Sequence, residues 1–367
     1  MKILKTSSKK KIGILTFHYS NNNFGAVIQA YSNYKLIESL GYEPYIIDFK
    51  PVNIIDFKGR ILTISQNVLG FKFHQFRRMK FSNFLKKGIN YDVLEDLNNQ
   101  LDLFTVGSDQ VWRYRNDEES LKKYYLNFVD DDKPKIAVAS SFGIEDWEGS
   151  ENITGVLKKL AKRFHAISVR EKSGSKICHD KFGCESDILL DPTMLVNQSV
   201  IHDLANNSNL IYNKKYLSYM LLDHSMEYEK YFKRIAINRK LNFVKIKGTR
   251  LIKRPDLWLY NSIGTWLDLI RKSEFVVTDS FHCIVFCLIF RRKFICLANQ
   301  KRGVSRLLNI LKMVGLENRF ITFLDKDKIT KSYNDEIDYE LIWDILEKEK
   351  TKSINFLKSN FKDCLDD

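Results

Sequence analysis

Short apolar runs alternate with polar loops and longer amphipathic segments along most of the chain. Near its start, Lys11–Phe17 is a brief apolar run that predicts a buried strand. The polar residues 18–24 follow, and Gly25–Leu40 then carries apolar residues at close to helical spacing. Gly41 marks the helix end and Glu43–Asp48 predicts a second strand, so this segment is expected to form a βαβ unit.

The same pattern of strand, loop and helix recurs as far as residue 196. Asp102–Val106 and Lys135–Ser140 are predicted strands, each followed by small polar residues and a glycine. Loops of this composition let backbone approach a ligand. Ala166–Val169 is a further predicted strand and runs directly into Arg170. These units predict a doubly wound α/β domain over residues 1–196, with ligands expected at the carboxyl edge of its sheet.

The pattern restarts in the second half of the chain. It predicts a second α/β domain over residues 197–336 and a long C-terminal helix over residues 337–367. The Asn and Ser content of Asn197–Asn213 is typical of a linker between the two domains. Two doubly wound domains of this kind are expected to face each other across a cleft that holds the ligand.

One stretch of the second domain, residues 275–297, combines a strand, a polar break and a buried helix. Phe275 begins a short β-branched run that predicts a strand, and Phe281–Phe290 is apolar on all sides, as in a buried helix. Asp279 or Ser280 can cap the start of this helix. The free N–H groups at such a start form an anion site, and His282 lies within its first turn. The alternative is a histidine that only caps the strand end.

Composition limits the classes of partner. The chain has 367 residues, 44% of them hydrophobic, and a net charge of +14, which favours an anionic partner. Nucleic acid, an acidic membrane face and a phosphorylated substrate all fit this charge, but no nucleic-acid motif occurs. The six cysteines show no CxxC spacing, so we expect reduced thiols in a cytoplasmic protein rather than disulfides or a zinc site. No secretory signal or membrane-spanning run is expected.

A basic and aromatic segment follows the first βαβ unit. Phe71–Leu97 alternates phenylalanines with arginines and lysines, and as a helix it would be amphipathic and cationic. Its Phe71–Lys87 part fits three roles: contact with a membrane surface, the lining of a groove for an acidic substrate, or packing of the Phe face on its own domain.

Several common catalytic motifs do not occur in the sequence, namely GxxxxGKS/T, GxGxxG after a strand, HExxH and GxSxG. Nucleoside triphosphatases, dinucleotide enzymes, zincins and α/β-hydrolases are therefore disfavoured. Basic groups and one histidine at predicted strand ends favour a group-transfer enzyme with a phosphorylated donor. The candidate residues are Asn23, Gly25, Ser108, Asp109, Gln110 and Arg170 in the first domain, and Asp279, Ser280, His282, Arg302 and Arg306 in the second.

At these residues the chain resembles the bacterial polysaccharide pyruvyl transferases. The motifs that carry the resemblance run in family order: Ile12–Phe17 with Asn23–Tyr31, Val106–Trp112, Ala139–Gly143, Ser168–Glu171, Leu190–Thr193 and Thr278–His282. The chain departs from the family pattern at Cys283 and Ile284, after the histidine, and at Arg113, after the tryptophan of the Ser-Asp-Gln motif. These departures bear on the donor pocket and the acceptor more than on the class.

The resemblance implies a fold similar to the two-domain GT-B glycosyltransferases. It implies phosphoenolpyruvate as donor, no metal or other cofactor, and a pyruvate ketal as product. The acceptor would be a sugar of a cell-surface polysaccharide or its lipid-linked precursor, in the cytoplasm and in peripheral contact with the inner membrane face. Phosphoenolpyruvate carries a carboxylate and a phosphate, so its site needs two separated cationic or N–H-rich groups.

The expected roles follow from this donor. His282 is assigned as general acid or phosphate contact, because an imidazole suits protonation of C3 of the donor. Arg170 would bind the phosphate or carboxylate, or else pair with Glu171, and Asp109 would act as base or acceptor ligand, or cap its own turn. The other expected donor contacts are Asp279, Ser280, Phe281, Arg302 and Arg306, where the two arginines are alternatively surface residues. The expected acceptor contacts are Asn23, Gly25, Ser108 and Gln110, where the first two alternatively form a plain turn.

Two other hypotheses stay open from the sequence. One is a GT-B-type glycosyltransferase that uses a nucleotide sugar. The other is a non-catalytic basic module that binds membrane or nucleic acid through Phe71–Lys87, with binding that falls steeply as salt rises.

Overall fold

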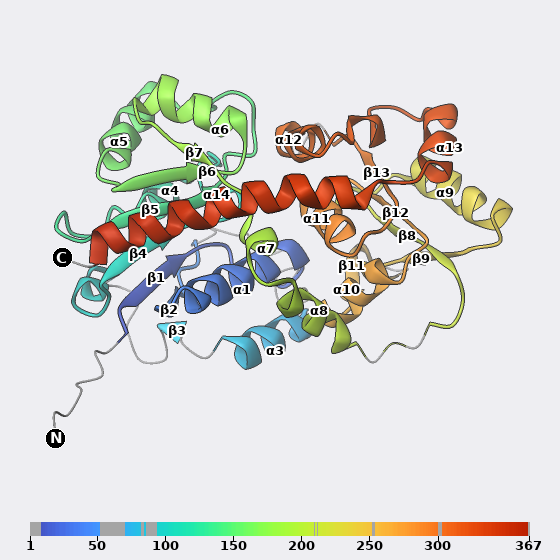
Figure 1. Cartoon of the computed structure of the whole chain (residues 1–367), viewed down its shortest axis with the longest axis horizontal. Coiled ribbons are helices and arrows are strands. Elements are labelled where there is room, and N and C mark those ends of the chain that lie inside the picture. Colours follow the sequence, from blue (N-terminus) through green and yellow to red (C-terminus); the bar gives the residue numbers. More distant parts are fainter. Residues whose placement is uncertain are drawn as a thin grey trace.

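The chain forms two α/β domains side by side, joined along their length by one long helix (Figure 1). The computed structural model describes residues 9–51, 70–81, 84–85, 94–208, 210, 212–251, 254–299 and 303–365. Within this part of the chain, no helix is both long and apolar enough to cross a membrane.

The first domain is built on a seven-stranded sheet in the order β3-β2-β1-β4-β5-β6-β7, with all neighbouring strands parallel. Its central strands are buried on both faces, as apolar runs in a parallel sheet require. The strands are β1 (Lys11–Leu15), β2 (Glu43–Ile47), β3 (Phe84–Leu85), β4 (Leu103–Val106), β5 (Lys135–Ser140), β6 (Ala166–Val169) and β7 (Asp187–Ile188). The helical segments are α1 (Phe24–Ser39), α3 (Phe71–Lys80), η1 (Leu94–Asn99), α4 (Glu118–Tyr124), α5 (Glu151–Ala161), α6 (Lys172–Ile177) and η2 (Cys178–Phe182).

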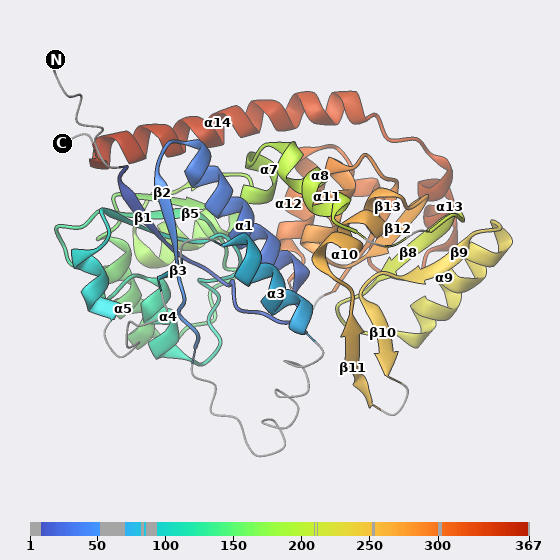
Figure 2. The same ribbon diagram turned by 90° about the horizontal axis from the view of Figure 1, so that it is seen from below.

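The second domain has a five-stranded parallel sheet in the order β14-β13-β12-β8-β9 and a projecting antiparallel hairpin, β10-β11 (Figure 2). Its strands are β8 (Tyr216–Met220), β9 (Asn242–Lys245), β10 (Gly248–Leu251), β11 (Arg254–Tyr260), β12 (Phe275–Thr278), β13 (Phe294–Leu297) and β14 (Phe320–Ile321). Its helical segments are α9 (Met226–Asn238), α10 (Ile263–Arg271), α11 (Phe281–Ile289), α12 (Ser305–Met313), η4 (Glu317–Arg319) and α13 (Lys326–Asn334). The predicted buried helix after β12 is therefore confirmed as α11.

Three helices link the domains: α7 (Pro192–Leu195), α8 (Gln198–Asn206) and α14 (Tyr339–Leu365). The predicted linker over Asn197–Asn213 does lie between the two sheets, but it contains helix α8, which buries Ile201, Leu204 and Ala205. Helix α14 runs across both domains in Figures 1 and 2. Near its start the Tyr339 hydroxyl donates to the Arg292 carbonyl, and near its end Phe361 contacts the ring of Tyr42 at 5.3 Å.

The basic segment after residue 70 is not one long helix. Helix α3 ends at Lys80, where Phe81 takes an extended conformation, and the chain then pairs β3 with β2 at the sheet edge. The Phe face of α3 packs on its own domain, with Phe73 4.8 Å from Phe24, and Arg77 donates to the Ser20 carbonyl at 2.6 Å. Within the described part of Phe71–Lys87, Phe73, Phe76 and Phe81 are buried, whereas Phe71 is 53% exposed.

Candidate active site

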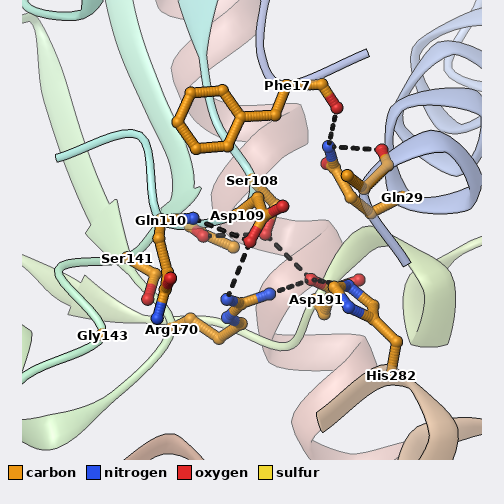
Figure 3. Close-up of polar contacts among 12 residues, drawn as sticks. Phe17, Gln29, Ser108, Asp109, Gln110, Ser141, Gly143, Arg170, Asp191 and His282 are labelled. Atoms are coloured by element: carbon orange, nitrogen blue, oxygen red, sulfur yellow. Dashed lines mark hydrogen bonds and ion pairs between the residues drawn. The ribbon is translucent and has the colours of Figure 1, made fainter. Parts of the chain in front are cut away.

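A cavity of about 430 Å³ lies between the two domains, at the carboxyl ends of their central strands. Its walls come from both domains, as expected for a site in the cleft. The first domain contributes Phe17, Asn23, Asp109, Gln110, Arg113 and Arg115, and the second contributes Leu222, Asp223, Ser280, Phe281, His282 and Arg306. Figure 3 shows the polar contacts beneath this cavity.

His282 is brought to the cavity by the junction of β12 and α11. The strand ends at Thr278, whose Oγ1 accepts a hydrogen bond from Ser280 N–H at 3.1 Å, and α11 begins at Phe281. The imidazole is 6% exposed, and its Nε2 has no hydrogen-bond partner. Across the domain boundary, a Cβ added to Gly25 would lie 2.2 Å from His282 Nδ1. The first turns of α1 and α11 therefore meet at this histidine, and Gly25 leaves the space for it.

Arg170 follows β6 and is held in the floor of the site (Figure 3). Its Nη1 donates to Asp191 Oδ2 at 2.6 Å, and its guanidinium lies 4.4 Å from the centre of the Phe281 ring. Burial lowers the pKa of Arg170, but the charges of Asp191 and Asp109 outweigh burial and raise it. Glu171 does not pair with it. Instead Glu171 Oε1 accepts from the Phe142 and Gly143 N–H groups and from the Ser141 hydroxyl.

Arg306, near the start of α12, is a buried cation without a counter-ion. Its side chain is 8% exposed, its Nε has no hydrogen-bond partner, and it forms no ion pair with any described residue. Burial, followed by the repulsion of Arg170, lowers the pKa of Arg306 to about 10. The surface-residue alternative for this arginine is therefore wrong, and the guanidinium presents an unpaired positive charge to the cavity.

Two further arginines of the cavity wall were not selected from the sequence. Arg115 donates to the Gln110 carbonyl at 3.1 Å and lies over the Phe17 ring at 5.3 Å. Arg113 lies 4.0 Å from Glu148. Arg113 stands where the family pattern has another residue, and this departure was the only sequence signal for it. Together with Arg306, they give the cavity wall three arginines beside the two carboxyl groups of Asp109 and Asp223.

Asp191 is the central carboxylate of the site and was also missed. Its Oδ2 accepts from Arg170 Nη1 and from the Ser108 hydroxyl at 2.9 Å, and its Oδ1 accepts from the Thr193 hydroxyl at 2.7 Å. Burial favours the neutral acid, but His282 and then Arg170 outweigh it and hold the pKa of Asp191 well below its usual range. The residue stands in a recognised motif, but an Asp before Pro192 has the ordinary explanation of a helix cap, which it also provides.

Most predicted site residues come together here, and a few occupy other positions. His282, Asp109, Gln110, Asn23, Ser280, Phe281 and Arg306 line the cavity, and Arg170 lies in its floor. Asp109 also caps its own turn, because its Oδ1 accepts from Gln110 N–H at 2.8 Å. Asn23 likewise accepts from Ala26 N–H at the start of α1.

Besides Arg170, three described residues of the prediction are not part of the cavity wall. Asp279 accepts from Leu222 N–H and from Asn299, both at 2.7 Å, and so ties two loops together. Ser108 is fully buried against Asp191, and Gly25 lies beneath His282. Arg302 lies outside the described residues. Among the described residues, no group of three or more His, Cys, Asp or Glu side chains could hold a metal ion.

The two parallel-sheet domains and the cavity between them define a GT-B-like protein, as the resemblance implied. A putative UDP-N-acetylglucosamine 2-epimerase from Listeria monocytogenes superposes with a TM-score of 0.52 at 11% identity, over 97% of this chain and 98% of that one. S. aureus MnaA, solved with UDP, superposes with a TM-score of 0.50 at 12% identity, over 97% of each chain. At these identities the likeness concerns the fold alone.

The family is narrower than the fold. A sequence model of the polysaccharide pyruvyl transferases matches residues 23–301, which include His282, Arg170 and Asp191, and the chain belongs to this family. A comparison with curated proteins finds no match.

Proposed function

We propose that this protein transfers the pyruvyl group of phosphoenolpyruvate to two hydroxyls of one sugar, forming a ketal and releasing phosphate. The observation that carries the proposal is the uncompensated charge of Arg306 in the cavity between the domains. Its pKa of about 10 leaves Arg306 protonated at neutral pH, and a buried cation without a partner is stabilised by an anionic ligand.

The other groups suit a ligand with two acidic ends. His282 Nε2, on the cavity wall, has no hydrogen-bond partner among the described residues, and behind it Arg170 Nη2 lies 3.7 Å from Asp109 Oδ1, which also lines the cavity. Helices α1, α11 and α12 all begin at the cavity, which places N-terminal N–H groups and positive dipole ends around it. Arg113 and Arg115 add charge on the opposite wall. These cations take the role that a metal has in other transferases, and we expect turnover to persist in EDTA.

The reaction needs one acid and one base. A proton adds to C3 of the donor while the first sugar hydroxyl, losing its own proton, bonds to C2. The C2–O bond to phosphate then breaks, phosphate leaves with the electron pair, and the second hydroxyl bonds to C2. The two protons lost by the hydroxyls balance those gained by C3 and by phosphate. His282 supplies the first proton, Asp109 accepts one from a hydroxyl, and Asn23 and Gln110 contact the sugar.

The acceptor we propose is a sugar of a polysaccharide precursor, lipid-linked and presented at the cytoplasmic face of the membrane. A lipid-linked acceptor predicts co-sedimentation of the protein with vesicles that contain it and not with phosphatidylcholine vesicles alone. The membrane contact would then depend on the acceptor rather than on a spanning segment.

The competing function is transfer from a nucleotide sugar, because a protein of the same fold was solved with UDP. Thermal shift separates the two donors. Stabilisation by phosphoenolpyruvate and not by UDP or GDP supports pyruvyl transfer, whereas the reverse result favours a glycosyltransferase.

The direct test is phosphate release from phosphoenolpyruvate with a panel of lipid-linked sugars. His282→Ala should lower the rate at least about 100-fold, the usual contribution of a general acid, and Arg306→Met should weaken phosphoenolpyruvate binding. His179→Ala is the matched control, because that imidazole is 69% exposed and paired only with its neighbour Asp180. Absence of phosphate release across the panel, or full activity of the His282 variant, would contradict the proposal.

A further inference from the structure

We propose that Asp191 is a positioning residue that links the two domains of the site: it fixes the direction of Arg170 and places a carboxylate beside the imidazole of His282. The catalytic role of Asp191 rests on the proposed function, whereas its contacts with Arg170 and His282 do not depend on which reaction the protein catalyses. Asp191 lies between the domains, after β7 and at the start of α7. It is 1% exposed and contacts a cation from each domain.

The first step concerns Arg170, which is held on two sides. One edge of the guanidinium is bound by Asp191 Oδ2 at 2.6 Å, and its face lies 4.4 Å from the centre of the Phe281 ring. These contacts fix the guanidinium plane, while Nε has no hydrogen-bond partner and Nη2 lies 3.7 Å from Asp109 Oδ1, beyond hydrogen-bond distance. A planar fork held in this way presents its remaining N–H groups in a set direction, which favours binding of a planar or tetrahedral anion.

The carboxylate is itself held firmly. Oδ1 accepts from the Thr193 hydroxyl at 2.7 Å and from Thr193 N–H at 3.0 Å, and Oδ2 lies 2.9 Å from the Ser108 hydroxyl. Asp191 therefore has little freedom to follow a moving side chain. The side chains that Asp191 contacts are therefore positioned by the backbone of two segments, the turn after β4 and the start of α7.

The second step concerns His282, whose Nε2 lies 3.7 Å from Asp191 Oδ2. The carboxylate therefore lies within ion-pair distance of the ring nitrogen that faces it, and an imidazolium there would be attracted to it. On the side of α1, the imidazole faces the backbone of Gly25, which carries no charge. The other charged groups around the imidazole are Arg170 in the floor and, on the cavity wall, Asp109, Arg113, Arg115, Asp223 and Arg306. Four of these six groups are arginines, and among the described residues Asp191 is the charged partner that lies within 4 Å of Nε2.

The test is a pH titration of the histidine rings by NMR, on the full-length protein without substrate. The sequence contains seven histidines, so His282→Gln identifies the signal of interest. In Asp191→Asn the midpoint of the His282 titration should fall by about one pH unit or more, the effect of losing a charge at this distance. Asp187→Asn, an exposed carboxyl of the same segment, is the matched control and should leave it unchanged.

A second variant keeps the inference testable if Asp191→Asn does not fold. Ser108→Ala removes one donor from Oδ2 and leaves the carboxylate charge in place. Without the Ser108 hydroxyl, Oδ2 accepts one hydrogen bond fewer, so the carboxylate should attract an imidazolium more strongly. The midpoint of the His282 titration should then rise by about a few tenths of a pH unit. A purely structural role for Asp191 predicts no shift in either variant, and an unchanged midpoint in either folded variant overturns the inference.

Activity measurements separate this inference from the proposed function. An active wild type whose His282 midpoint is insensitive to both variants contradicts the role of Asp191 and leaves pyruvyl transfer standing. A wild type that releases no phosphate, but whose midpoint moves as expected, contradicts pyruvyl transfer and leaves the electrostatic role of Asp191 intact.

Discussion

At the scale of single residues, the structure gives a different reason for the glycine at position 25 from the one that the sequence suggested. The sequence suggested that it shapes a loop over the acceptor. In the structure it is the second residue of α1, and an added Cβ would lie 2.2 Å from Nδ1 and 2.5 Å from Cγ of His282. The absence of a side chain at Gly25 therefore serves a histidine of the other domain.

Gly25→Ala should impair catalysis without unfolding the protein. The new methyl group must displace the imidazole, and a shift of about 1 Å at a catalytic group costs on the order of 100-fold in rate. Phosphoenolpyruvate affinity should fall less, because the three atoms nearest the added methyl all belong to His282. Phosphate-release kinetics combined with calorimetric titration of the donor measure both quantities.

Gly155→Ala is the matched control for this prediction. Gly155 lies within helix α5, and an added Cβ would meet nothing within 4 Å. Alanine there should stabilise the protein by about 0.5–1 kcal/mol through helix propensity and leave the rate unchanged. Equal kinetics for the two alanine variants would show that His282 tolerates the methyl group and would remove the argument for close contact.

The sequence predicted some site residues well because their position along the chain determines their position in space. His282 and Arg170 each follow a buried strand, and the carboxyl ends of parallel strands gather at one edge of a sheet. Arg115 does not follow a strand, and Asp191, although it comes after β7, has the ordinary explanation of a helix cap. Their importance comes from contacts with Arg170, Gln110 and Phe17, which are made only when distant segments pack together.

At the scale of elements, strands and helices with a clear period were predicted, whereas short edge elements were not. Helix α11 ends within one residue of its predicted bounds because its apolar run is long and continuous. The helix predicted over Phe71–Leu97 stops at Lys80, because pairing of β3 with the sheet edge competes with helical periodicity. Helix α8 was missed because a short segment rich in Asn has the composition of a loop.

Helix α14 makes a testable contribution to stability where it meets the first domain. Phe361 is fully buried and contacts Tyr42, so Phe361→Ala should lower the free energy of unfolding by about 3–5 kcal/mol, the range for a large aromatic removed from a core. Leu341→Ala on the same helix is the control, because Leu341 is 59% exposed and should change stability by less than about 0.5 kcal/mol. Urea denaturation at neutral pH measures both, and equal values would show that α14 is not docked on the first domain.

At the scale of the whole molecule, one hydrophobic cluster extends across both domains, and each domain also has a separate cluster of its own. A single cluster of buried side chains includes Ile14 and Phe24 of the first domain and Trp266 and Phe286 of the second. Phe24 stacks on Trp266 with ring centres 4.7 Å apart and planes 14° from parallel. Neither domain can separate from the other without exposing part of this core to water. The sequence predicted two domains and a cleft, but the extent of their shared core depends on side chains that meet only in three dimensions.

The shared core predicts that the protein unfolds in one transition. Domains within a chain usually contact through modest polar interfaces and unfold separately, so two transitions are the ordinary expectation for 367 residues. In this protein, unfolding of one domain would remove apolar contacts from α1, α10 and α11 at once. The other domain would then lose stability and unfold at the same temperature. Scanning calorimetry should give one peak whose van't Hoff enthalpy equals the calorimetric enthalpy, and phosphoenolpyruvate should move that whole peak upward. Two resolved peaks, or a shift confined to part of the trace, would show that the domains are energetically independent and that the cavity can open by their separation.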